Sequence, residues 1–266
     1  IIGAGFSTII ATLAALLLFL VYYLAREHRE TFQVGKSFHF DRGIMRRFLR
    51  LGTPSGMEMF LNVAAFNLFL LMFQSYGVAQ GAAAAIVFNW DILSYIPMVG
   101  LNIGVLSMIG RFVGAGDMQR SNEVISSGFL IGLLYSAILA LIYISFRYPL
   151  VDVFEPPTGD FEEIRELAAF MMVGLASYAM ADAIIQVCGG ALRGAGDTRW
   201  VMWSSVSLHW IMLVLQFLII RVFDYGPRAS WLAFVVMILA IAVVFVARLR
   251  SGIWRDPERL RMVMAE

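Results

Sequence analysis

Long uninterrupted runs of apolar residues dominate the hydrophobic pattern of the chain. Short polar stretches separate seven such runs, at roughly 2–25, 48–75, 82–110, 121–146, 164–192, 199–222 and 229–249. About 20 apolar residues in a helix cross the hydrocarbon core of a bilayer. The runs lack the alternation of polar and apolar residues that marks the strands of a membrane barrel, so each must satisfy its backbone within a helix. The pattern therefore predicts an all-α polytopic membrane protein with seven spanning helices.

The amino-acid composition is also that of a membrane protein. Hydrophobic residues make up 60% of the 266 residues and charged residues only 15%, and the mean hydropathy is +0.79. These values lie outside the range of soluble globular chains. The net charge of +1 conceals an uneven distribution of charges and by itself indicates no partner. The apolar runs predict a lipid bilayer as the partner, and we expect no nucleic acid. The one cysteine, Cys188, lies in an apolar run, which excludes an internal disulfide and indicates a small buried residue.

The basic residues predict an orientation. Lys and Arg number 20, and most of them follow the first, third, fifth and seventh runs. The segment between the fourth and fifth runs is instead acidic. Because basic loops stay on the cytoplasmic side, we expect a multi-pass protein of the inner (plasma) membrane with a cytoplasmic carboxyl end.

A charged stretch sets the first run apart from the other six. We expect residues 1–25 to be a single helix left from a missing amino-terminal lobe, since the chain starts without Met. Residues 26–47 are then a charged cytoplasmic linker, and residues 48–250 a lobe of six transmembrane helices. Residues 251–266 complete the chain as a cytoplasmic tail.

Two similar segments end the third and fifth runs, GRFVGAGDMQR (110–120) and GALRGAGDTR (190–199). Their glycines favour a left-handed turn at the end of a helix, and Asp117 or Asp197 can cap the helix that follows. This similarity indicates a bundle built from helix pairs. Glycine pairs spaced four residues apart predict close helix packing; they are Gly52 and Gly56, Gly100 and Gly104, Gly110 and Gly114, Gly128 and Gly132, and Gly190 and Gly194.

Away from the ends of the runs lie four Asp, Glu or His residues: Glu58, Asp91, Asp182 and His209. Each costs about 2.5 to 3.5 kcal/mol to insert into a membrane, which makes it a functional candidate. Glu58, Asp182 and His209 each lie about ten residues from a cytoplasmic end, so all three reach a depth of roughly 15 Å. They could share one layer, which Asp91 approaches from the outer side. The alternative for each is a buried, hydrogen-bonded group that only holds helices together.

Polar residues and a proline mark the third run as a bent helix beside a cavity. Pro97 removes a backbone hydrogen bond and kinks a helix. We predict a cavity lined by Asp91 and His209 together with Asn89, Pro97, Asn102 and Gln186. A carboxylate in such a cavity can bind and release a proton, or serve as a hard oxygen ligand for sodium. Either process would couple transport to an ion gradient.

Sequence motifs for catalysis are absent. The sequence contains no HExxH, no GxSxG and no Walker loop, which argues against a metalloprotease, a hydrolase or a self-contained ATP-driven pump. Asp117 and Asp197 follow Gly-x-Gly sequences like those of intramembrane aspartyl proteases, but they lie at the water interface. We expect no enzyme activity and no cofactor.

Three segments resemble the multidrug and toxic compound extrusion (MATE) family. They are LRLGTPSGMEMFLNVAAFNLFLL (49–71), AAAAIVFNWDILSYIPMVGLNIGVLSMIGRFVGAGD (82–117) and ADAIIQVCGGALRGAGDTR (181–199). The resemblance implies twelve helices in two lobes joined by a cytoplasmic loop, and export of organic cations and other drugs in exchange for sodium ions or protons. The chain is similar to the sixth helix, the linker and the complete second lobe.

The resemblance also assigns coupling residues. Asp182 matches a carboxylate implicated in cation coupling in the second lobe. The other carboxylate of that site falls on Asn62, by its spacing from Pro54, and Glu58 lies one turn earlier as a substitute. The resemblance therefore implies Asp182, Glu58 and Asn62 as the cation-coupling residues, with a proton or a sodium ion at Asp182 and no other metal.

We therefore expect an efflux antiporter for drugs or organic cations, of which this chain is one part. Because the substrate cleft of the family lies between two lobes, the missing first lobe is an expected partner. A flippase for lipid-linked oligosaccharides from the same superfamily is the alternative, although the runs contain no Lys or Arg away from their ends and its cavity would need basic residues. A half-protein that transports nothing without a partner chain is an alternative of another class.

Overall fold

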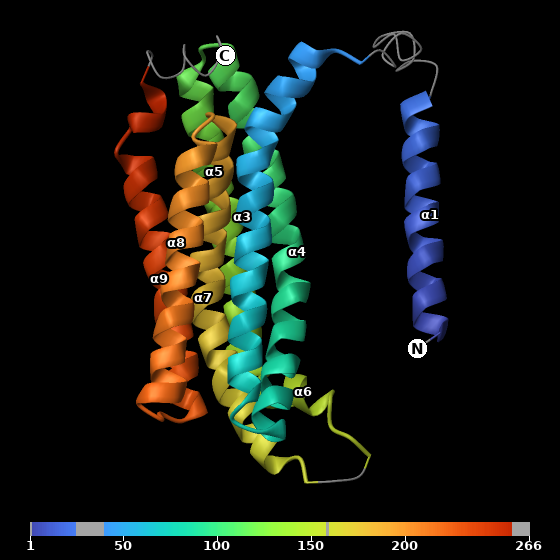
Figure 1. Cartoon of the computed structure of the whole chain (residues 1–266), viewed down its shortest axis with the longest axis vertical. Coiled ribbons are helices and arrows are strands. Elements are labelled where there is room, and N and C mark those ends of the chain that lie inside the picture. The colour runs from blue at the N-terminus through green and yellow to red at the C-terminus, as the bar shows by residue number, and fades with distance from the viewer. Residues whose placement is uncertain (1, 25–39, 158–159, 257–266) are drawn as a thin grey trace. The chain divides into compact units, whose positions relative to one another are not determined.

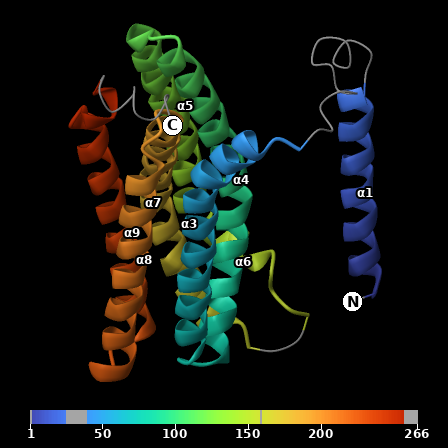
Figure 2. The same ribbon diagram turned by 45° about the horizontal axis from the view of Figure 1, so that its top comes forward.

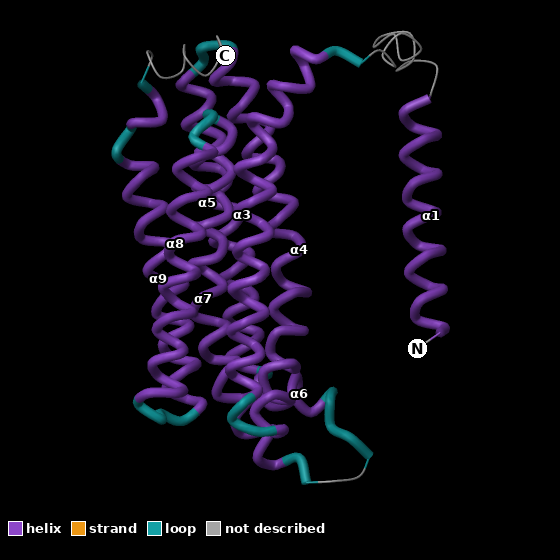
Figure 3. Tube along the Cα trace, in the orientation of Figure 1, coloured by secondary structure: helices purple, strands orange, loops and turns teal. Residues whose placement is uncertain are grey.

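A computed structural model of the chain describes residues 2–24, 40–157 and 160–256. All regular structure within these residues is helical (Figures 1 and 3). The helices are α1 (Ile2–Leu24), α3 (Arg42–Gln74), α4 (Val78–Gly114), α5 (Met118–Ser145), α6 (Arg147–Asp152), α7 (Glu162–Gly194), α8 (Thr198–Phe217) and α9 (Pro227–Arg250). A π-helical turn, Leu218–Val222, continues α8, and a short 3-10 helix, Ile253–Arg255, follows α9.

The seven predicted spans are confirmed. Seven helices are long and apolar enough to cross a membrane, and α6 is a short additional helix. One boundary was wrong: α3 begins at Arg42, so residues 42–47, predicted as linker, form its first turns. Residues 26–39 of the predicted linker lie outside the described residues. Of the predicted tail, residues 251–256 are described, and Trp254 there is buried and donates to the Leu249 carbonyl.

The chain divides into two compact units. The first, Ile1–Arg50, holds α1 and the start of α3, and the second, Leu51–Glu266, holds the rest. Every described side chain of α1 is exposed. The core belongs to the second unit.

Helix α7 is the centre of the second unit. Its main neighbours are α4, α5 and α9, and α8 packs beside α9 (Figure 2). Small residues let α4 approach α7 closely: a Cβ on Gly190 would lie 2.8 Å from the Asn102 carbonyl oxygen. Gly128 and Gly132 of α5 likewise face Val187. The packing prediction is therefore correct for these three glycines and for Gly194, where a Cβ would lie 2.6 Å from the Leu106 carbonyl oxygen. A Cβ on Gly110 would make an ordinary contact at 3.5 Å, whereas Cβ atoms on Gly52, Gly56, Gly100, Gly104 and Gly114 would meet nothing within 4 Å.

Helix α3 joins the bundle through long aromatic side chains. The Phe66 ring lies 4.9 Å from that of Phe88 on α4, and the Phe69 ring lies 4.9 Å from that of Phe234 on α9. Aromatic side chains of this length hold helices together at a greater separation than glycine contacts do. Space is therefore left between α3 and α7.

Helix α6 is fixed to α7 by an ion pair. Arg165 donates from Nε to the Asp152 carboxylate at 2.6 Å. This hydrogen bond lowers the pKa of Asp152, which lies outside the spanning helices.

The two Gly-Ala-Gly-Asp segments end their helices as predicted but use their aspartates differently. Gly116 and Gly196 both have the left-handed backbone, with φ of 75° and 84°. Asp117 caps α5 by accepting from the Arg120 N–H at 3.0 Å. Asp197 makes no cap and instead pairs with Arg248 of α9 at 2.9 Å.

Breaking the Asp197–Arg248 pair is expected to destabilise the second unit. Asp197 is 2% exposed, and Asp197→Ala leaves the guanidinium without its carboxylate. Because Arg248 keeps its place over the Trp200 ring and is partly exposed, we expect a loss of about 2 kcal/mol, below the usual figure for a buried pair. Thermal unfolding in detergent measures the effect. Asp117→Ala is the matched control, since losing an exposed cap costs only about 1 kcal/mol; equal shifts for both variants would contradict the prediction.

Candidate functional site

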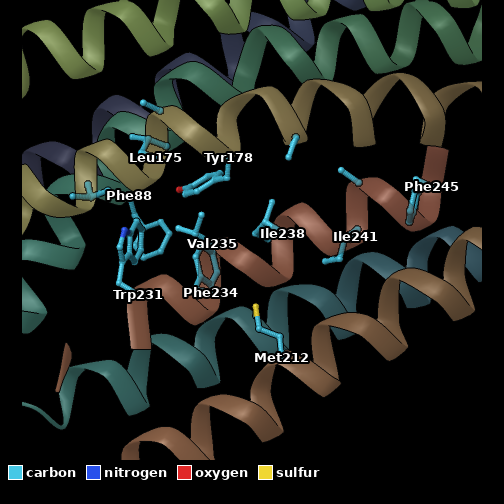
Figure 4. Packing of buried hydrophobic residues seen from close by; sticks show 14 of the residues in the cluster. Phe88, Leu175, Tyr178, Met212, Trp231, Phe234, Val235, Ile238, Ile241 and Phe245 are labelled. Atoms are coloured by element: carbon cyan, nitrogen blue, oxygen red, sulfur yellow. The ribbon is translucent and has the colours of Figure 1, made fainter. Parts of the chain in front are cut away.

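A cavity of about 350 Å³ lies within the second unit, bounded by α3, α4, α7, α8 and α9. One wall is apolar, and Figure 4 shows α9 presenting a row of side chains toward α7 and α8. The apolar lining consists of Val63, Phe66, Phe88, Ile92, Ile185, Met212, Phe234, Ile238, Ile241 and Phe245. The polar lining consists of Glu58, Asn62, Asp91, Tyr95, Tyr178, Asp182, Gln186, Arg193, Ser205 and His209. An apolar wall combined with polar groups that converge on one cavity is typical of a small-molecule site.

Asp91 of α4 and Asp182 of α7 lie together in this lining. Both also bound a smaller pocket of about 10 Å³ against α5, and their charges lie close enough to interact. Neither carboxylate takes part in an ion pair within the described residues. The sequence placed Asp182 beside Glu58 and Asn62, but the carboxylate that approaches it is Asp91.

A tyrosine lies beside this carboxylate pair. Tyr178 is one turn before Asp182 on α7, is 2% exposed, and packs edge-on against Phe234 at 5.7 Å (Figure 4). Its hydroxyl lies close enough to the Asp91 carboxylate to interact with it. Asn62 Oδ1 has no hydrogen-bond partner among the described residues. Buried polar atoms are normally satisfied by protein or water, so Asn62 Oδ1 is available to a ligand in the cavity.

Glu58 is engaged by an arginine that the sequence analysis missed. Arg193 Nη2 donates to Glu58 Oε1 at 2.6 Å, which joins α7 to α3. The runs were predicted to hold no basic residue away from their ends, and that prediction missed Arg193, which lies in the last turn of α7 and lines the cavity. Its side chain folds back along α7 over Gly189, where a Cβ would lie 2.9 Å from Nη1. A glycine one turn before an arginine was the signal for this arrangement.

Ser205 of α8 holds two of the predicted residues. Asn62 Nδ2 donates to the Ser205 hydroxyl at 2.7 Å. His209 Nδ1 lies 2.8 Å from the Ser205 backbone oxygen, in the next turn of the same helix. Glu58, Asn62 and His209 therefore line the cavity from α3 and α8, while Asp91 and Gln186 line it from α4 and α7.

Three residues predicted for the lining lie elsewhere. Asn89 is exposed and donates to the Ala85 carbonyl within α4. Pro97 is exposed on the same helix. Asn102 donates to the Gln186 carbonyl at 2.6 Å and so occupies the contact between α4 and α7. For these three residues, the helix face that each occupies could not be predicted from the sequence.

Comparison with known proteins identifies the family. The family model described as MatE matches residues 54–218. The multidrug resistance protein MdtK of Yersinia pseudotuberculosis serotype O:1b (strain IP 31758) is 23% identical over 255 residues. The match covers 94% of this chain and 55% of MdtK, so the chain spans about half the length of this relative.

Solved transporter structures share the fold. The MATE transporter ClbM, solved in complex with Rb⁺, gives a TM-score of 0.66 at 22% identity, covering 84% of this chain and 50% of ClbM. A MOP superfamily transporter from Pyrococcus furiosus Vc1 (DSM3638) gives a TM-score of 0.67 at 20% identity, covering 80% of this chain and 45% of that one. The second unit therefore has the fold of these helical membrane transporters.

Proposed function

The chain belongs to the MATE family, whose members are transporters rather than enzymes, and we propose that it forms the ion-coupled lobe of an efflux antiporter. The whole protein exports drugs or other organic cations in exchange for sodium ions or protons. Since the chain spans about half of its relative, an amino-terminal lobe completes the substrate cleft. The protein resides in the inner membrane with its carboxyl end in the cytoplasm.

The Asp91–Asp182 pair carries this proposal. Two carboxylates that share a low-dielectric cavity repel one another, and a bound proton or sodium ion relieves the repulsion. Occupation by the ion thus changes how α4 and α7 fit together. Helix displacement that depends on ion occupancy is what an antiporter needs. The pair supports coupling to either ion.

The rest of the lining favours a cationic, aromatic substrate. Phe66, Phe88, Phe234 and Phe245 offer ring faces, and organic cations bind to aromatic rings and carboxylates. The relative MdtK is itself described as a multidrug resistance protein. The lining also argues against a lipid-linked oligosaccharide flippase, because Arg193 is neutralised by Glu58 and leaves no surplus positive charge.

Ethidium efflux from energised cells that express the full-length protein tests this function. A protonophore and a sodium ionophore are applied separately, and we expect one of them to stop efflux and so identify the ion. Efflux that survives both treatments would refute ion coupling. Failure to export ethidium or any other tested cation would move the assignment to the flippase. Expression of residues 1–266 alone tests the half-protein alternative and is expected to give no efflux.

A further inference from the structure

Arg193 occupies an unusual place for a residue at the cytoplasmic end of a spanning helix. Long basic side chains at helix ends normally extend toward water. Arg193 instead folds back over Gly189 into the cavity, and its side chain is 21% exposed. A Cβ at position 189 would meet Nη1 at 2.9 Å, so the glycine makes room for this conformation.

Its partner Glu58 is more deeply buried. The Glu58 side chain is 7% exposed and the two groups are 2.6 Å apart. A buried carboxylate without a partner is costly and takes up a proton or a cation, whereas a paired one has its charge compensated already. Glu58 therefore has no need of the coupling ion while Arg193 is in place.

The other ionisable groups of the cavity come from three helices. Asp91 and Tyr95 come from α4, Tyr178 and Asp182 from α7, and His209 from α8, while the described lining from α9 is apolar. The negative charge of Glu58 also acts on His209, and the positive charge of Arg193 acts on Tyr95. Of the three carboxylates in the lining, Glu58 is the one that forms an ion pair with Arg193 within the described residues.

We propose that Arg193 is a specificity-determining residue that withdraws Glu58 from ion coupling and leaves Asp91 and Asp182 as the carboxylates that respond to the ion. The inference rests on the proposed function and refines its ion site. It replaces Glu58, the coupling residue implied by the family resemblance, with Asp91. It also gives Gly189 a positioning role, because any side chain there displaces the guanidinium.

Proton uptake by the purified full-length protein tests this assignment without transport. The protein, in detergent and sodium-free buffer, is titrated between about pH 8.5 and about pH 5.5, where ordinary carboxylates stay ionised. Arg193→Gln should take up about one proton more per molecule than the wild type, because Glu58 loses its compensating charge. Arg193→Lys keeps the charge and should match the wild type.

Two further variants assign the extra proton to Glu58. The double variant Glu58→Gln/Arg193→Gln should return to the wild-type count, and Glu58→Gln alone should also match it. An extra proton that persists in the double variant would overturn the proposal, because it would arise at Asp91 or Asp182. Loss of a proton in Glu58→Gln alone would overturn it too, since Glu58 would then be a responsive site. If wild-type efflux is absent the proposed function fails, while the proton counts still decide the role of Arg193.

Discussion

Asp182→Asn is expected to reduce ethidium efflux to the level of cells that lack the transporter. The amide has nearly the volume of the carboxylate, but it binds no proton and is a weaker ligand for sodium. With Asp182 neutral, its repulsion with Asp91 is lost in every state, so ion occupancy no longer changes the contact between α4 and α7. Efflux is measured in energised cells and normalised to the amount of transporter in the membrane.

Asp152→Asn is the matched control for this prediction. Asp152 is also a carboxylate with a close partner on α7, the guanidinium of Arg165, but it lies on α6 outside the spanning helices. Its exposed ion pair contributes little to stability, so efflux should match the wild type. Normal efflux in Asp182→Asn at normal abundance would make Asp182 a structural residue and move the coupling role away from the carboxylate pair.

The helices and the depth of the site followed from the sequence because both depend on local quantities. The length of an apolar run fixes where a chain can span the membrane, and the rise of 1.5 Å per residue fixes the depth of each side chain. Glu58, Asn62, Asp182 and His209 do line one cavity, as these quantities predicted.

The contact partners of these side chains could not be predicted from the sequence, because they depend on how each helix is rotated about its axis against its neighbours. Glu58 and Asp182 share a depth, yet Glu58 faces Arg193 while Asp182 lies near Asp91. The two Gly-Ala-Gly-Asp segments also show that local structure is predictable from the sequence whereas tertiary contacts are not. Their backbone turns were predictable from glycine alone, but Arg248, which pairs with Asp197, lies 51 residues away in sequence. A local motif carries no information about such a contact.

The contact between α4 and α7 depends on Gly194, and Gly194→Val is expected to destabilise the second unit strongly. An added Cβ would lie 2.6 Å from the Leu106 carbonyl oxygen and 2.9 Å from Ile109 Cβ. The first of these atoms belongs to the backbone of α4, so no side-chain rotation can relieve the overlap. Forcing two packed helices apart costs about 3 kcal/mol.

The separation of α4 and α7 would also disturb the ion site, because these helices carry Asp91 and Asp182. We therefore expect Gly194→Val to lower the thermal unfolding temperature in detergent and to abolish efflux. Gly104→Val is the matched control, since it adds the same side chain to α4 where a Cβ would meet nothing within 4 Å. It should retain both stability and efflux. Equal losses in the two variants would show that valine is harmful in these helices for reasons other than the close approach of α4 to α7.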